Sequence, residues 1–123
     1  MTMRNELEHT EQVMLMQWWS LAHHQFGIPE PLLFAIPNGG QRNIIVASKL
    51  KAEGVRAGIP DLFLAVPRRD AHGLFIEMKK AHGGRTSSKQ DAALDMLAKQ
   101  GYTWAVCHGW TEAKKCIEGY LRG

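Results

Sequence analysis

Residues 58–79 read GIPDLFLAVPRRDAHGLFIEMK and contain two apolar segments on either side of a polar one. Segments 62–66 and 74–79 have the length and the aromatic and branched residues of β-strands. Pro60 stands at the entrance of the first strand, where a missing backbone N–H is tolerated. The polar residues 67–73 are short enough that an antiparallel hairpin is the simplest interpretation.

Helical and strand patterns alternate on both sides of this hairpin. The expected elements, in chain order, are a helix at 10–26, a strand at 32–36, a helix at 43–53, the hairpin, a helix at 87–100, a strand at 102–107 and a helix at 111–121. Ser87 and Gln90 have the spacing of a capping box, which marks the start of the third helix. Four strands that alternate with helices predict an α/β fold with a mixed sheet.

Length and composition indicate one globular domain. The chain has 123 residues, of which 45% are hydrophobic and 22% are charged, and this balance argues against disorder. No stretch approaches the roughly 18 apolar residues of a membrane helix, and the start has no apolar signal segment. We therefore expect a cytoplasmic protein without a membrane partner, whose two cysteines are reduced.

The net charge of +3 is distributed unevenly along the chain. Residues 1–41 carry a net charge of −3, residues 42–90 carry +6, and residues 91–123 are balanced. A basic central segment suits a partner that carries phosphates.

Three reactive side chains lie on the hairpin. Glu77 and Lys79 are two residues apart on one strand, so they point to the same face of the sheet. Asp61 lies at the entrance of the partner strand, where a hairpin brings it near Glu77. Two adjacent carboxylates repel each other, and Mg²⁺ or Mn²⁺ removes that cost. With a lysine to orient a water or neutralise phosphate charge, the set suits metal-assisted phosphodiester hydrolysis.

The order of the motifs resembles one family of nucleases. Pro60-Asp61 followed by Glu77-Met78-Lys79 matches the P-D…(D/E)-x-K pattern of restriction-endonuclease-like nucleases. Segments 38–40, 58–62, 76–79 and 87–90 occur in the order typical of the VRR-NUC family, the virus-type replication-repair nucleases. The resemblance covers about residues 6–121, so we expect a single VRR-NUC domain over residues 1–123. It implies a restriction-endonuclease-like α/β core, with a mixed four-stranded sheet flanked by helices.

The resemblance also implies roles for individual residues. Asp61 and Glu77 would bind Mg²⁺ or Mn²⁺, with the backbone carbonyl of Met78 as a third ligand. Lys79 would be the catalytic lysine. Gln90 would face the site from the following helix, and Glu11, on the first helix, would hold a metal-bound water. The residues expected to contact DNA are Asn38, Gly39, Gly40, Arg42, Lys80, Arg85 and Lys89.

Stand-alone copies of this domain, found in phages and bacteria, resemble Holliday-junction resolvases. The resemblance therefore implies a homodimeric endonuclease that cuts four-way DNA junctions during repair, in a bacterial cell or an infected host cell. Two alternatives remain open, which are a DNA-binding module with this fold but no turnover, and a nuclease with less structural selectivity.

Purely structural roles for the same residues also remain open. Asp61 fits a turn or capping residue, and Glu77 with Lys79 fits an exposed charged pair. Gln90 fits the reciprocal half of the capping box, and Glu11 fits an acid favoured by the helix dipole.

Overall fold

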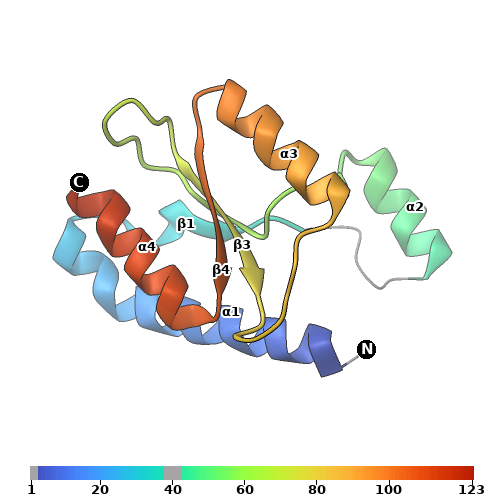
Figure 1. Ribbon diagram of the computed structural model, residues 1–123, viewed down its shortest axis with the longest axis horizontal. Helices are drawn as coiled ribbons and strands as arrows, with labels where there is room; N and C mark the ends of the chain where they lie inside the picture. Colours follow the sequence, from blue (N-terminus) through green and yellow to red (C-terminus); the bar gives the residue numbers. More distant parts are fainter. Residues whose placement is uncertain (1–2, 38–42) are drawn as a thin grey trace.

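The computed structural model of the chain describes residues 3–37 and 43–123 (Figure 1). Its elements are α1 Met3–Ala22, the 3₁₀ helices η1 His23–Phe26 and η2 Glu30–Leu32, β1 Leu33–Ala35, α2 Ile44–Ala52, β2 Leu62–Leu64, β3 Leu74–Lys79, α3 Ser88–Lys99, β4 Thr103–His108 and α4 Trp110–Arg122. None of the helices in these two ranges is long and apolar enough to cross a membrane.

The strands form one mixed sheet in the order β1-β2-β3-β4. β1 pairs with β2 and β2 with β3 in antiparallel fashion, whereas β3 and β4 are parallel. The β2–β3 pair is the hairpin that the sequence predicts. The predicted fold class, a mixed four-stranded sheet flanked by helices, is confirmed.

The register of the hairpin brings two carboxylates together. Leu62 lies opposite Ile76 and Phe63 lies opposite Phe75. One more step in this register puts Asp61 beside Glu77, and directly opposite side chains of an antiparallel pair share a face. The backbone N–H of Ile36 donates to the carbonyl of Asp61 at 2.8 Å, so β1 holds the same segment from its other side.

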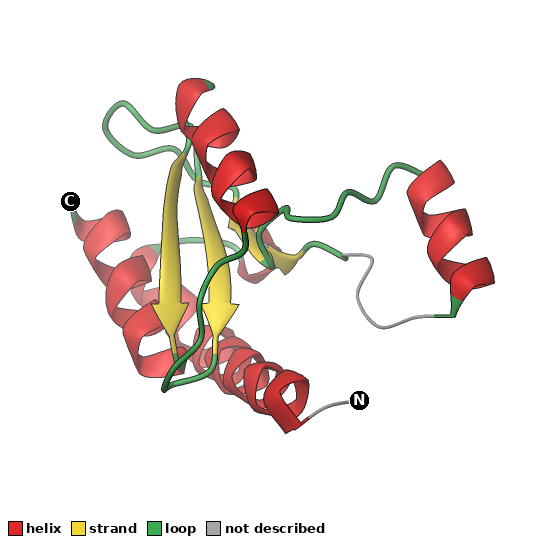
Figure 2. Ribbon diagram, turned by 45° about the vertical axis from the view of Figure 1, so that its right-hand side comes forward, coloured by secondary structure: helices red, strands yellow, loops and turns green. Residues whose placement is uncertain are grey.

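One face of the sheet carries the hydrophobic core. α1 and α4 cover this face (Figure 2). Leu15 and Trp19 from α1 and Ile117 from α4 are fully buried against it. The buried sheet residues on this side are Leu33, Leu62, Leu64, Leu74, Ile76, Met78 and Cys107.

The opposite face of the sheet leads from an aromatic cluster to the polar end of β3. The rings of Phe63 and Phe75 stack with their centroids 4.3 Å apart, and Tyr102 packs edge-on against both rings. Because side chains alternate along a strand, Glu77 and Lys79 share this face with Phe75. α3 runs beside it, as Figures 1 and 2 show, and buries its residues Ala93 and Leu94.

The first turn of α3 is fixed by the predicted capping box. The Ser87 hydroxyl accepts from the backbone N–H of Gln90, and the Gln90 side-chain oxygen accepts from the backbone N–H of Ser87. This reciprocal pair satisfies two amides that the helix itself leaves unpaired. It also fixes the position of the Gln90 side chain.

The helix α2 lies to one side of the sheet, on the side of α3. Figures 1 and 2 show it beyond the edge of the sheet, and none of its residues is buried. Asn43 caps its start, because the Asn43 side-chain oxygen accepts from the backbone N–H of Val46 at 2.8 Å.

Candidate active site

Asp61 and Glu77 form a hydrogen-bonded pair of carboxyl groups at one end of the hairpin. The backbone N–H of Met78 donates to Asp61 Oδ2 at 2.7 Å, which fixes the Asp61 side chain against β3. The side chain of Glu77 is almost fully enclosed, since the residue is only 3% exposed. The burial of Glu77 excludes the interpretation as an exposed surface pair.

The two carboxyl groups strongly perturb each other. Burial and the negative charge of Asp61 raise the pKa of Glu77 to about 8, although Lys79 opposes the change. Burial also raises the pKa of Asp61, against the opposing effect of the hydrogen bond from Met78. A proton shared at this pair therefore offsets the repulsion near neutral pH. A divalent cation between the carboxylates would replace that proton.

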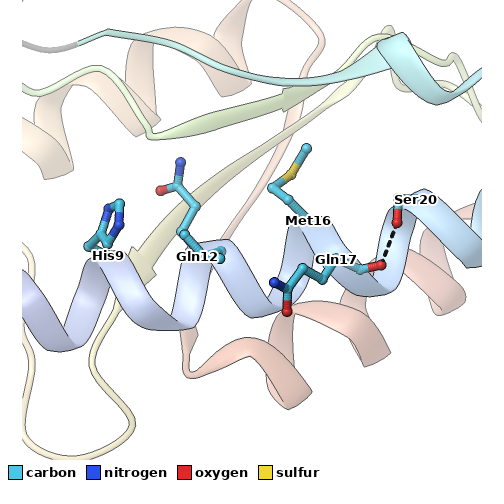
Figure 3. A pocket seen from close by; sticks show the side chains of 6 residues that line it. His9, Gln12, Met16, Gln17 and Ser20 are labelled. Atoms are coloured by element: carbon cyan, nitrogen blue, oxygen red, sulfur yellow. Dashed lines mark hydrogen bonds between the residues drawn. The ribbon is translucent and has the colours of Figure 1, made fainter.

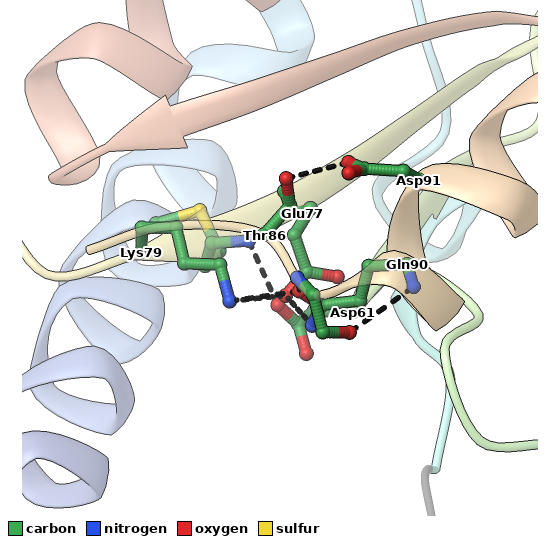
Figure 4. A network of polar contacts seen from close by, with 8 residues as sticks. Asp61, Glu77, Lys79, Thr86, Gln90 and Asp91 are labelled. Atoms are coloured by element: carbon green, nitrogen blue, oxygen red, sulfur yellow. Dashed lines mark hydrogen bonds and ion pairs between the residues drawn. The ribbon is translucent and has the colours of Figure 1, made fainter.

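Lys79 lies beside the pair and is held by Gln90 (Figure 4). Its Nζ is 3.5 Å from Glu77 Oε2 and donates to Gln90 Oε1 at 3.2 Å. The Gln90 Nε2 in turn donates to Glu77 Oε2 at 3.0 Å. Gln90 thus combines the two roles that the sequence left open, because the oxygen that completes the capping box also receives Lys79.

The loop after β3 encloses the lysine. A Cβ placed on Gly84 would lie 3.0 Å from the Cβ of Lys79, so a glycine allows the close approach of this loop. Downstream, the hydroxyl of Thr86 donates to Asp91 Oδ1 at 2.6 Å and ties the loop to the first turn of α3 (Figure 4). Lys79 is 4% exposed as a result.

Glu11 has a structural partner outside the carboxyl pair. Its Oε1 accepts from the backbone N–H of Trp110 at 2.7 Å, at the start of α4. Glu8, also on α1, adds to the raised pKa of Asp61, although burial is the larger cause. Glu8 could not be identified from the sequence, because it precedes the predicted helix at 10–26 and only the packing of α1 brings it near Asp61.

The basic residues expected to contact DNA are partly in view. Lys80 is half-buried, and Arg85 and Lys89 are exposed near the start of α3. Asn38, Gly39, Gly40 and Arg42 lie outside the described residues.

Two further cations stand next to Lys89. Lys51 and Arg56 line a cleft of about 390 Å³ together with it. The close approach of Gly58 to α3 sets the position of this cleft. A Cβ added to Gly58 would lie 2.9 Å from the Lys89 carbonyl oxygen. No sequence motif marks Lys51 or Arg56, because only the fold of the segment after α2 brings them to Lys89.

The donor set suits a hard divalent cation. Carboxylate and carbonyl oxygens are the preferred ligands of Mg²⁺ and Mn²⁺, which also retain waters or substrate oxygens. Within residues 3–37 and 43–123, no cluster of three or more His, Cys, Asp or Glu side chains is arranged as a metal site. The candidate is therefore the Asp61–Glu77 pair, with the backbone carbonyl of Met78, the residue after Glu77, as a further candidate oxygen ligand.

Two comparisons with known proteins find the same family. The profile of the VRR-NUC domain matches residues 4–111 of the chain. A solved structure of a VRR_NUC domain protein is 31% identical, with a TM-score of 0.80, over 94% of this chain and 88% of the other. The comparison with curated proteins finds no match. Matched in sequence and in fold over most of its length, the chain belongs to the VRR-NUC family of nuclease domains.

Proposed function

We propose that the protein is an Mg²⁺- or Mn²⁺-dependent endonuclease that hydrolyses phosphodiester bonds in branched DNA, as a Holliday-junction resolvase does. The observation that carries this proposal is the pair of half-buried Asp61 and buried Glu77, with the Lys79 ammonium 3.5 Å from Glu77. A binding module has no need to bury such a set, because an uncompensated carboxylate pair is costly.

Asp61 and Glu77 would hold the cation, and the Met78 carbonyl is the proposed third ligand. The raised pKa of Glu77 supports this assignment, since it shows a site that favours added positive charge. When bound, the metal supplies Lewis-acid stabilisation of phosphate charge and lowers the pKa of a coordinated water.

The remaining residues would orient the reaction. Lys79 would position the attacking water or neutralise charge on the phosphate as the 3′ oxygen leaves, so that the product carries a 5′-phosphate. Gln90 would keep the lysine in place through the contacts in Figure 4.

The acidic helper on the first helix would be Glu8. Glu8 acts electrostatically on Asp61, whereas Glu11 is engaged with the start of α4. We therefore propose Glu8 for the role that the family resemblance suggested for Glu11, which is to hold a water near the metal.

The substrate assignment rests on charge and size. The cations Lys80, Arg85 and Lys89 follow β3 closely, and Lys51 and Arg56 extend the basic surface from Lys89. Such a surface suits the phosphate backbone. Two symmetric cuts in a four-way junction need two active sites related by a two-fold axis, which favours a homodimer.

The test is cleavage of a labelled four-way junction, a matched linear duplex and a flap, each with Mg²⁺, Mn²⁺ or EDTA. We expect paired, near-symmetric nicks in the junction that require metal. Asp61→Asn should abolish the nicks while junction binding, measured by gel shift, is kept.

Other outcomes separate the alternatives. Cutting of the linear duplex as fast as the junction would indicate a nuclease with less structural selectivity. Tight binding without product in either metal would support a DNA-binding module and overturn the proposed reaction.

A further inference from the structure

We propose that α2 is a dimerisation arm, and that its apolar face docks into a groove on α1 of a second copy of this chain. This inference rests on the homodimer of the proposed function and assigns its contact surface. It begins with α2, whose apolar residues lie in solvent. Ile44 is 84% exposed and Ile45 is 70% exposed.

The two most exposed isoleucines of α2 share one side of the helix with Ala52. At 100° per residue, Ile44, Ile45 and Ala52 fall on adjoining positions, and Lys49 stands at the edge of this strip. We call these four residues the α2 face. A nine-residue helix with no buried side chain is marginal by itself in water, so packing against a partner would stabilise it.

A second apolar surface lies on α1. A groove of about 340 Å³ runs along it, lined by His9, Gln12, Val13, Met16, Gln17 and Ser20. Figure 3 shows the side chains of His9, Gln12 and Met16 projecting from the same side of α1. Val13 is 39% exposed there. We call this surface the α1 groove.

The two surfaces carry opposite charges. Glu6 lies one turn before His9 on the side of α1 that holds the groove, and it is exposed. The α1 helix carries three glutamates and one arginine, whereas α2 carries two lysines and no acidic residue. Charge complementarity of this kind favours a second copy as the occupant and sets the direction of docking.

An antiparallel arrangement matches both patterns. On α2, the step from Ile45 to Lys49 is about 6 Å along the axis, and on α1 the step from Val13 to Glu6 is about 10 Å. The lysine stem spans the difference, so Ile45 would enter the groove near Val13 while Lys49 reaches Glu6. The contact would form twice about a two-fold axis, since each copy offers both surfaces.

The contact is expected between two chains. Figures 1 and 2 both show α2 standing away from α1 of its own chain. The basic cleft adjoins the α2 face, because Lys51, which lines that cleft, lies about 20° from Ile44 around the helix, on the side away from Lys49.

The test is the mass of the full-length protein in solution, measured by analytical ultracentrifugation over a concentration series. We expect a dimer whose dissociation constant rises about 100-fold in Ile45→Glu and in Val13→Glu, because each change buries a charge in an apolar contact. The matched control is Met96→Glu, at a 60% exposed methionine on α3, which should remain dimeric.

A charge exchange separates specific docking from misfolding. Glu6→Lys and Lys49→Glu should each weaken the dimer by about tenfold, because the ion pair occurs twice, and the double variant should recover wild-type affinity. Cysteines introduced together at positions 13 and 45 should form a disulfide between chains under oxidation.

Three results would overturn the proposal. They are a monomeric wild type, unchanged dimerisation in the two glutamate variants, and a cross-link within one chain only. If Ile45→Glu leaves the dimer intact but abolishes junction binding, the α2 face contacts DNA instead. Metal-dependent cleavage by a monomeric wild type would preserve the proposed nuclease while removing this surface.

Discussion

Glu77 combines a buried carboxyl group with an unusual proton affinity. Its pKa is raised from 4.5 to about 8, first by burial and second by the charge of Asp61. The folded protein therefore holds a proton that the unfolded chain releases above pH about 4.5. The stabilisation from this proton is complete below that pH and is lost as the pH rises through about 8.

We predict that Glu77→Gln stabilises the metal-free protein at high pH. The amide can donate to Asp61 at any pH and can still accept from Gln90, so the folded state no longer loses a stabilising proton. At pH 9 the gain should be on the order of 2–4 kcal/mol, since each pKa unit is worth about 1.4 kcal/mol. Thermal melts in EDTA at pH 5, 7 and 9 measure it. A wild-type melting temperature that does not fall with pH relative to the variant would contradict the assignment.

Lys79 offers a second prediction at the residue level. Lys79→Ala should lower the single-turnover cleavage rate by about 100-fold or more, because the group acts on charge that develops during the reaction. Junction affinity should change little, since Lys79 is 4% exposed and contributes little surface. Near-normal cleavage by Lys79→Ala would remove the lysine from the mechanism.

The reactive residues could be predicted from sequence only where strand spacing decides their position. The alternation of side chains along β3 places Glu77 and Lys79 on the same face of the sheet. The register of the hairpin then brings Asp61 beside them. The effect of Glu8 on the pKa of Asp61 could not be predicted, because it depends on how α1 crosses the sheet. The metal-binding role of the Met78 carbonyl and the DNA contacts of Lys80, Arg85 and Lys89 stay predictions.

Among the elements, α3 contributes both to the folding of the chain and to the geometry of the candidate site. The capping box that starts the helix uses the same Gln90 oxygen that receives Lys79. A local folding signal thereby fixes a side chain of the candidate active site.

We predict that Ser87→Ala lowers the free energy of unfolding by about 1 kcal/mol, the usual effect of losing an N-cap. The matched control is Ser88→Ala, which leaves the cap intact and should change stability by a few tenths of a kcal/mol. Urea titration followed by circular dichroism compares them. Equal stability of the Ser87 variant and the wild type would show that the box does not stabilise α3.

The boundaries of the elements show where local signals suffice. The strand at 74–79 was predicted to the residue, and the start of α3 was predicted from its capping box. α1 begins at Met3 and not at residue 10, because its first two turns are polar and carry little apolar periodicity. β4 is shifted by one residue, to Thr103–His108, since its ends follow the pairing with β3 and not its own composition.

At the scale of the whole molecule, positive charge gathers near the end of the sheet that holds Asp61 and Glu77. Lys51, Arg56 and Lys89 come from separate segments and meet in one cleft beside α3. Counting charges along the sequence identifies the basic segment 42–90, whereas the cleft forms only when the chain folds.

We predict that the double variant Lys51→Ala/Arg56→Ala binds junction DNA with a weaker salt dependence. The slope of log affinity against log salt should fall by about 2, as expected for the loss of two phosphate contacts. The control is Lys99→Ala/Lys115→Ala, which removes two exposed lysines that lie outside this cleft. An identical slope for the cleft variant and the wild type would exclude the cleft from the DNA path.

The central claim is that Asp61 and Glu77 together bind a divalent cation in place of a proton. Titration calorimetry with Mn²⁺ at pH 7, in two buffers of different ionisation enthalpy, measures metal binding and proton release together. We predict binding to the wild type with release of about one proton per metal, since Glu77 is protonated before binding, and loss of binding in Asp61→Asn. Absence of Mn²⁺ binding to the wild type, or equal binding by Asp61→Asn, would contradict the account.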